Sequence, residues 1–173
     1  MSTLRPAACY RVWKRPYTRI SRRVPKKSYV VGVPEPKIRQ FQSGDERAKF
    51  DVELHLVATR TVQIRHNALE AARTNSNKYL TDNAGTYFFK VVPYPYHVMR
   101  ENSMATGAGA DRLQEGMRRS FGQPVGFAAR VRAGQTLIVA RVSKDKEAAA
   151  REALWRAAAK LPTPCTIESV AIK

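Results

Sequence analysis

Alternating apolar and polar positions predict a strand just after residue 50. In the run "FDVELHLV" every second residue from Phe50 to Leu56 is apolar, which is the period of a half-buried strand. Further strands are expected over residues 86–92, 125–131, 135–142 and 165–172, where β-branched and aromatic side chains gather. Ala133 and Gly134 lie between the second and third of these runs and indicate a hairpin turn. Folded structure is therefore expected from about residue 50 onward.

Three segments have the sequence pattern of helices. The first follows Asn67, which is expected to form a capping box with Glu70, and extends to residues 83–85. A short second helix is expected from Asp111 to Phe121, with Gly122 ending it. The third is alanine-rich and covers about residues 145–161, with an inner stripe at Ala150, Leu154, Ala157 and Leu161. Strands and helices mixed without strict alternation predict a single α+β domain with a mixed or largely antiparallel sheet.

The first 40 residues differ from the rest in charge and in proline content. They contain 11 Lys and Arg against one acid, Glu35, and five of the ten prolines. Because proline removes an amide donor and favours extended neighbours, we interpret residues 1–40 as an extended basic arm with little core of its own. Residues 41–173 are then the folded domain, with a flexible loop at about 101–109.

The total charge indicates a polyanionic partner. The net charge is +17, from 31 Lys and Arg against 14 Asp and Glu, which is more than solubility requires. The longest uncharged apolar run, about residues 136–140, is far shorter than the roughly 20 residues of a membrane-spanning helix. The chain also starts without an apolar signal core, so a cytoplasmic protein is expected. Cys9 and Cys165 are far apart in sequence and indicate free thiols, with no metal site.

Nucleic acid is the favoured polyanion. Arginine outnumbers lysine 20 to 11, and guanidinium groups both grip phosphates and stack on bases. In the arm, Tyr10, Trp13 and Tyr17 alternate with cations, which suits stacking on unpaired RNA bases; alternatively, these rings fold back onto the domain. The side chains predicted to bind RNA are Arg5, Arg11, Trp13, Lys14, Arg15, Arg19, Arg22, Arg23, Lys26, Lys27, Arg112, Arg118, Arg119, Arg130 and Arg132.

Catalysis finds little support in the sequence. The three histidines, His55, His66 and His97, are scattered and lie in no nucleophile or zinc motif, and we assign no catalytic residue and no cofactor. Gly107 and Gly109 have only part of the spacing of a dinucleotide-binding loop. Two alternatives stay open on residues alone. One is an RNA-modifying or RNA-processing enzyme that holds its substrate with the basic arm, and the other is a chromatin-type DNA-binding protein.

One stretch resembles a known family closely. Residues 110–131, "ADRLQEGMRRSFGQPVGFAARV", are similar to the signature of the large-subunit ribosomal proteins of the universal L sixteen family, in their archaeal and eukaryotic L ten e form. That signature reads ADR, three residues, GMR, a small and an aromatic residue before glycine, and finally ARV. The stretches "RPAACYR", "KRPYTRIS" and "GVPEPKIRQF" resemble the basic N-terminal arm of the family. Gln123 departs from it, because the family usually has Lys or Arg there.

The resemblance implies a fold of the α/β-hammerhead type and a place on the large ribosomal subunit, lined by large-subunit rRNA near the entry site of aminoacyl-tRNA. It implies as partners rRNA, tRNA, neighbouring ribosomal proteins and, during subunit maturation, assembly factors. It also implies that a loop reaches toward the acceptor ends of tRNAs near the peptidyl transferase centre, where RNA performs the chemistry. The residues of this loop are Glu101, Asn102, Ser103, Met104, Ala105, Thr106, Gly107, Ala108 and Gly109.

Overall fold

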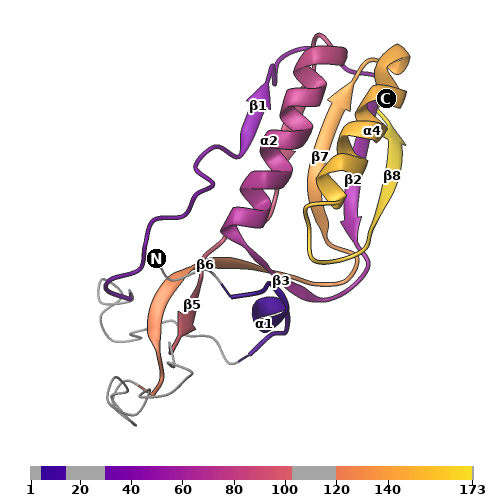
Figure 1. The fold of residues 1–173 in the computed structure, drawn as a ribbon. Coiled ribbons are helices and arrows are strands. Elements are labelled where there is room, and N and C mark those ends of the chain that lie inside the picture. Colours follow the sequence, from indigo (N-terminus) through magenta and orange to yellow (C-terminus); the bar gives the residue numbers. More distant parts are fainter. Residues whose placement is uncertain (1–4, 15–29, 103–119, 173) are drawn as a thin grey trace, which may run out of the picture.

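A computed structural model describes residues 5–14, 30–102 and 120–172 of the chain (Figure 1). Its strands form two antiparallel sheets. The five-stranded sheet contains, in spatial order, β1 (Gln42–Gly44), β4 (Phe88–Val91), β7 (Thr136–Val142), β2 (Val52–Ala58) and β8 (Cys165–Ala171). The three-stranded sheet contains β3 (Val62–Arg65), β6 (Gln123–Val131) and β5 (His97–Glu101). The mixed α+β class predicted from the pattern is confirmed.

Two long helices cover the five-stranded sheet. These helices are α2 (His66–Asn83) and α4 (Glu147–Ala158), and the 3-10 helix η2 (Lys144–Lys146) precedes α4. They pack side by side over one face of the sheet, while the three-stranded sheet extends away from it with the short helix α1 (Ala8–Arg11) beside it (Figure 1). Alanines at the inner face of α4 are fully buried, and their small side chains allow the helix to approach its neighbours closely.

The main core lies between the five-stranded sheet and the two long helices. The pattern of β2 explains how the sheet contributes, because Leu54 and Leu56 are fully buried while Glu53 and His55 are only partly covered. Glu53 accepts hydrogen bonds from Arg141 on β7, with 2.8 Å from Nε to Oε2, and pairs with His55 Nε2 at 2.8 Å. From the helices, Leu69, Leu80 and Leu154 complete the core. The predicted half-buried strand is thus confirmed, and its one carboxylate, Glu53, serves structure.

The hairpin predicted at Ala133 and Gly134 is wrong. Gly134 does sit in a turn with φ +78°, but β6 pairs with β3 and β5 whereas β7 pairs with β2 and β4. The chain therefore passes from one sheet to the other at this turn. It does so beside the β2–β3 connection, since Gly134 N donates to Ala58 O at 2.8 Å and Ala58 N donates to Gln135 O at 3.0 Å. Both edges of β7 are already paired, one with β2 and the other with β4, so β6 has no place beside it.

Several boundaries also differ from the sequence expectations. Folded structure begins before residue 50, because β1 starts at Gln42 and Ile38 is 1% exposed within the core. The expected capping box is absent: α2 starts at His66 with no side-chain cap, and Glu70 pairs with Arg73 instead. The arm is not extended throughout, since α1 interrupts it. The helix expected at 111–121 lies almost wholly outside the described residues, and Gly122 behind it has φ +77°.

Candidate nucleic-acid interface

Charge divides the described part of the molecule into two ends. The three-stranded sheet, α1 and the connections beside them carry eleven Lys and Arg against two Asp and Glu. This part, the basic end, comprises residues 5–14, 30–40, 59–66, 92–102, 120–135 and 159–164. The remaining described residues form the neutral end, the five-stranded sheet with α2 and α4, which carries ten Lys and Arg against ten Asp and Glu. An excess of one sign concentrated at one end attracts a polyanion to that end.

The N-terminal segment is fixed to the basic end by an acid on β5. Glu101 binds Arg5, with 2.6 Å from Nε to Oε1, and accepts a hydrogen bond from the Tyr10 hydroxyl at 2.8 Å. Burial, followed by the hydrogen bond to the Glu101 carboxylate, raises the pKa of Tyr10 to about 12. Arg65 on β3 adds a hydrogen bond from Nη1 to the Arg5 carbonyl at 2.9 Å, and its guanidinium lies 5.8 Å from the Tyr10 ring centre.

A second anchor holds the ring of Trp13. Its Nε1–H donates to the carbonyl of Val62 on β3 at 2.9 Å. The guanidinium of Arg130 on β6 lies 5.4 Å from the ring centre, and its Nη2 donates to the carbonyl of Lys14. Arg130 Nε also donates to Gln63 Oε1 at 3.3 Å. The two strands of one sheet thus hold the segment that follows α1.

Where the structure describes the arm, its rings are docked on the domain in the free protein, and their stacking on RNA stays a prediction. Tyr10 and Trp13 are half-buried and fold back onto the domain, so they are anchors in the free protein. Arg5 and Arg130, both predicted to bind RNA, take part in the same anchoring. Among the other predicted side chains with described positions, Arg11, Lys14 and Arg132 are exposed. Their side chains have no ion pair within the described ranges, which leaves them able to meet phosphates.

Nine of the predicted RNA-binding residues and most of the predicted loop fall outside the described part of the chain. Arg15, Arg19, Arg22, Arg23, Lys26, Lys27, Arg112, Arg118 and Arg119 lie outside the described residues, as do residues 103–109 of the predicted loop. Of that loop, Glu101 and Asn102 are described. Glu101 is the acid that holds Arg5 and Tyr10, and the carbonyl of Asn102 accepts a hydrogen bond from Arg5 at 3.1 Å.

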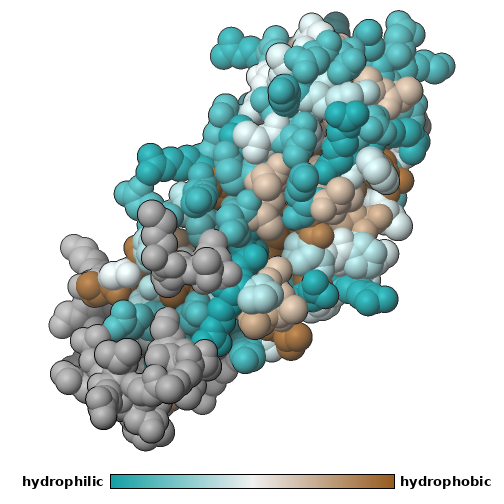
Figure 2. Space-filling view, in the orientation of Figure 1, coloured by the Kyte–Doolittle hydropathy of each residue, from teal (hydrophilic) through white to brown (hydrophobic). Residues whose placement is uncertain are grey.

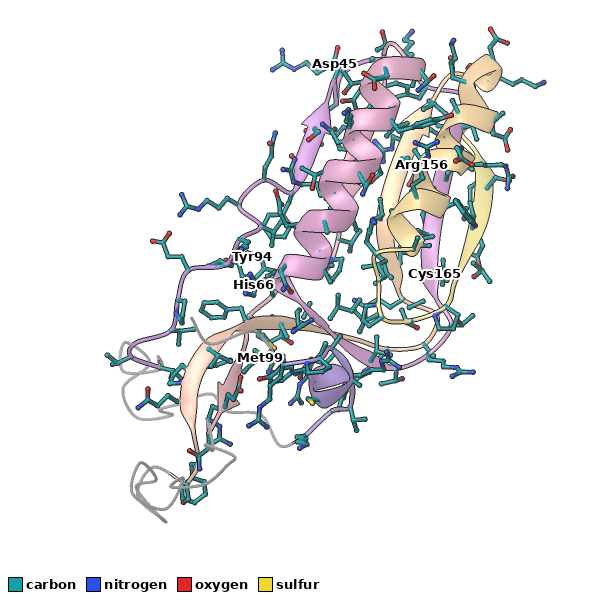
Figure 3. All side chains as sticks on the ribbon, viewed as in Figure 1. Asp45, His66, Tyr94, Met99, Arg156 and Cys165 are labelled. Carbon is teal, nitrogen blue, oxygen red and sulfur yellow. The ribbon has the colours of Figure 1, made fainter. Side chains whose placement is uncertain are left out.

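Two of the histidines lie where the sheets meet. His66 begins α2, and its Nδ1 accepts the backbone N–H of Lys37 at 2.9 Å; Figure 3 labels it at the start of this helix. Burial, then the charges of Lys37 and Arg65, lowers the pKa of His66. Burial and Arg130 likewise lower the pKa of His97. Both shifts favour the neutral imidazole, and the His97 ring also lies against the Tyr96 ring, with 4.3 Å between the ring centres.

Other kinds of site find no support in the described ranges. No cluster of three metal-binding side chains occurs in 5–14, 30–102 or 120–172. No helix in that same part of the chain has the length and apolar character needed to cross a membrane. Cys9 and Cys165 are free thiols, and burial raises the pKa of Cys165 to about 11. The face in Figure 2 is mostly hydrophilic, with apolar residues in separate patches.

Sequence reasoning missed several side chains of the basic end. Arg65 and Gln63 lie on β3, a four-residue strand too short to give a clear period, and Lys160 follows α4. The exposed rings of Tyr94 and Tyr96, 59% and 57% exposed, lie between β4 and β5. The sequence contains a signal for these rings, because proline and tyrosine alternate in "VVPYPYH". Prolines favour an irregular connection, in which the tyrosine rings can be exposed.

Comparison with known proteins adds an independent finding. Residues 14–168 match the profile of a family described as Ribosomal protein L16p/L10e. The chain is 50% identical over 167 residues to "Large ribosomal subunit protein uL16" of Staphylothermus marinus, covering 95% of this chain and 92% of that protein. It is 49% identical to the protein of the same name from Picrophilus torridus, with 88% and 89% covered, and 47% identical to that of Methanococcus maripaludis, with 95% and 92% covered.

Proposed function

Because the chain belongs to the family of ribosomal protein L16p/L10e, whose members are structural parts of the ribosome rather than enzymes, we propose how it works within the large ribosomal subunit. Its basic end binds large-subunit rRNA, and residues 101–109 help to position tRNA near the aminoacyl site and the peptidyl transferase centre. Neighbouring ribosomal proteins and assembly factors are further partners. The similarity to archaeal relatives makes this an archaeal-type member of the family.

The uneven charge is the observation that carries the proposal. Eleven cations against two acids at the basic end, beside ten against ten at the neutral end, give a directed attraction to phosphates. The predicted loop fits the same orientation, since residues 103–119 connect β5 to β6, whose linked ends point away from the five-stranded sheet (Figure 1). An RNA-bound basic end therefore brings this connection toward RNA as well.

The proposed rRNA binding is tested by sedimentation of a cell extract through sucrose at moderate salt. The protein is expected to migrate with large subunits, and recovery only at the top of the gradient contradicts the proposal. Purified protein should also bind protein-free large-subunit rRNA with strong salt dependence. For about six to ten phosphate contacts, affinity falls by roughly a thousand- to a hundred-thousand-fold between about 50 and 200 mM salt.

The tRNA contact requires a test of its own. A photoreactive residue in place of Ala105 is expected to crosslink to tRNA in assembled ribosomes carrying aminoacyl-tRNA. The matched control places the same group at Trp155, which is 64% exposed on α4 at the neutral end and should give no tRNA product. Equal yields at both positions, or none at Ala105 in active ribosomes, would remove the tRNA role and leave the rRNA role intact.

A further inference from the structure

A cavity of about 220 Å³ lies where four separate parts of the chain meet. It is bounded by α1, by β3, by the start of α2 and by the segment after α4. Its polar lining consists of Arg11, Gln63, Arg65 and Lys160, and no carboxylate belongs to the lining. At about 30 Å³ for each water molecule, the space accommodates one phosphate group together with several waters.

The three cations at this cavity have few partners of their own. Arg11 and Lys160 are exposed, and within the described ranges neither side chain forms an ion pair. Arg65 uses Nη1 on the Arg5 carbonyl and lies against the Tyr10 ring, which fixes its guanidinium while other N–H groups remain to donate. Three like charges around one cavity repel each other, and an anion between them removes this repulsion.

One further side chain and one helix end add to the potential for an anion at this cavity. The Gln63 side-chain oxygen accepts from Arg130 Nε, which leaves the amide NH₂ group to donate. The first turn of α2 has no acid and contributes Ala68 to the wall, and the Ala68 backbone N–H donates to Asn67 Oδ1 at 3.0 Å. The positive end of this 18-residue helix therefore adds to the potential that the cations create.

We propose that this cavity is a phosphate-binding site, formed by Arg11, Arg65, Lys160 and Gln63, that takes a backbone phosphate of large-subunit rRNA. The inference rests on the proposed function and specifies one contact within it. A phosphate held there joins the N-terminal segment, at Arg11, to the end of α4, at Lys160. RNA binding then fixes α1 against the domain more firmly than the contacts of Tyr10 and Trp13 do alone.

The test compares two double variants with equal loss of charge. Arg11→Gln with Lys160→Gln removes two cations of the cavity, and Lys144→Gln with Lys146→Gln removes two exposed cations at the neutral end. Binding to protein-free large-subunit rRNA is measured for both and for the unchanged protein as a function of salt. The cavity variant is expected to bind roughly tenfold more weakly than the control. The slope of log K against log salt concentration should also be smaller in magnitude for the cavity variant, by roughly 0.7 to 0.9, which corresponds to the loss of about one phosphate contact.

The outcomes separate this inference from the function on which it rests. If the unchanged protein does not bind rRNA, the proposed function fails. If it binds and the two double variants bind equally well with the same salt slope, only the cavity assignment fails. Urea unfolding of each variant shows whether a loss of binding reflects a loss of folding.

A second probe, inorganic phosphate, distinguishes an RNA contact from a site for a free anion. Weak binding, detected at millimolar phosphate as shifts of the Gln63 side-chain amide and the Ala68 backbone amide in NMR spectra, is expected and should disappear in the cavity variant. Submillimolar binding of inorganic phosphate, together with unchanged rRNA affinity in the cavity variant, overturns the assignment to RNA.

Discussion

Replacing Arg130 with glutamine is expected to loosen the N-terminal segment without unfolding the domain. The guanidinium of Arg130 reaches three groups: the Trp13 ring, at 5.4 Å from its centre, the Lys14 carbonyl and the side chain of Gln63. All three contacts are lost in Arg130→Gln. The hydrogen bond from Trp13 Nε1 to Val62 remains, so the segment is weakened rather than set free.

The size of the effect follows from these contacts. A cation–π pair at a partly exposed position contributes about 0.5 to 1 kcal/mol. A hydrogen bond from a charged donor adds about 1.5 kcal/mol when it is well shielded, and less here because the Lys14 end is exposed. The expected sum is about 1 to 2 kcal/mol for the local docking equilibrium, which increases the undocked population roughly 5- to 30-fold. The core lies elsewhere, so the free energy of global unfolding should change little.

Tryptophan fluorescence provides the assay, because the chain has two tryptophans. With Trp155→Phe as the background, Trp13 is the only tryptophan, and acrylamide quenching reports how far its ring is covered. Quenching should be moderate in this background and clearly stronger after Arg130→Gln. Arg132→Gln is the matched control, since it removes the same charge from an exposed residue just beyond β6 and should leave quenching unchanged. Equal quenching in the two variants would refute the anchoring role of Arg130.

The same protein also tests whether Trp13 stacks on RNA. If the ring stays docked, addition of rRNA should protect it from acrylamide. Strong static quenching by RNA in the Trp155→Phe background, together with a red-shifted spectrum, would mean that the ring leaves its place to stack on bases. In that case the intramolecular contacts describe only the free protein.

Three further outcomes are expected. The pKa of His66 is lowered in the folded state, so its contribution to stability is present above about pH 6.5 and decreases as the pH falls below that value. The urea midpoint of His66→Gln should therefore fall less between pH 7.5 and 5 than that of the unchanged protein. The pKa of Tyr10 is raised, so its contribution to stability is lost as the pH rises, the opposite of His66. Docking of α1 should persist up to about pH 10 and weaken toward about pH 12. Tyrosinate absorbance follows this transition, which a Tyr10→Phe variant should lack. Leu154→Ala removes a fully buried side chain and should cost about 2 to 5 kcal/mol in urea unfolding, whereas a cost below 1 kcal/mol contradicts the described core.

Local patterns were sufficient for most elements of the neutral end, and the three-residue strand β1 is the exception. The strands β2, β4, β7 and β8 and the helices α2 and α4 appear where alternation or helical spacing indicated them. Each of these elements packs one face against a large core, so burial imposes its period on the sequence. The strands β3 and β5 were missed because they have only four and five residues. Strands this short contain too few alternations of apolar and polar residues to be recognised in the sequence.

Pairing between distant segments could not be derived in the same way. The turn at Gly134 has the composition of a hairpin, and only the positions of β3 and β5 decide that β6 joins another sheet. The arm posed a related problem. A run of alternating rings and cations suits stacking on RNA, but it equally suits docking on a surface that offers its own cations, such as Arg65 and Arg130. The sequence of the arm does not reveal which surface it meets.

The two ends of the molecule also differ in what holds them together. Most fully buried side chains lie between the five-stranded sheet and its helices, so hydrophobic burial stabilises the neutral end without a partner. Among the described residues, the N-terminal part of the basic end relies on hydrogen bonds, one ion pair and ring contacts at half-exposed positions, each of which contributes little in water. It also concentrates unneutralised charge, which opposes docking. An RNA phosphate at the basic end therefore adds stability where the chain alone provides least, which couples ordering of the N-terminal segment to binding.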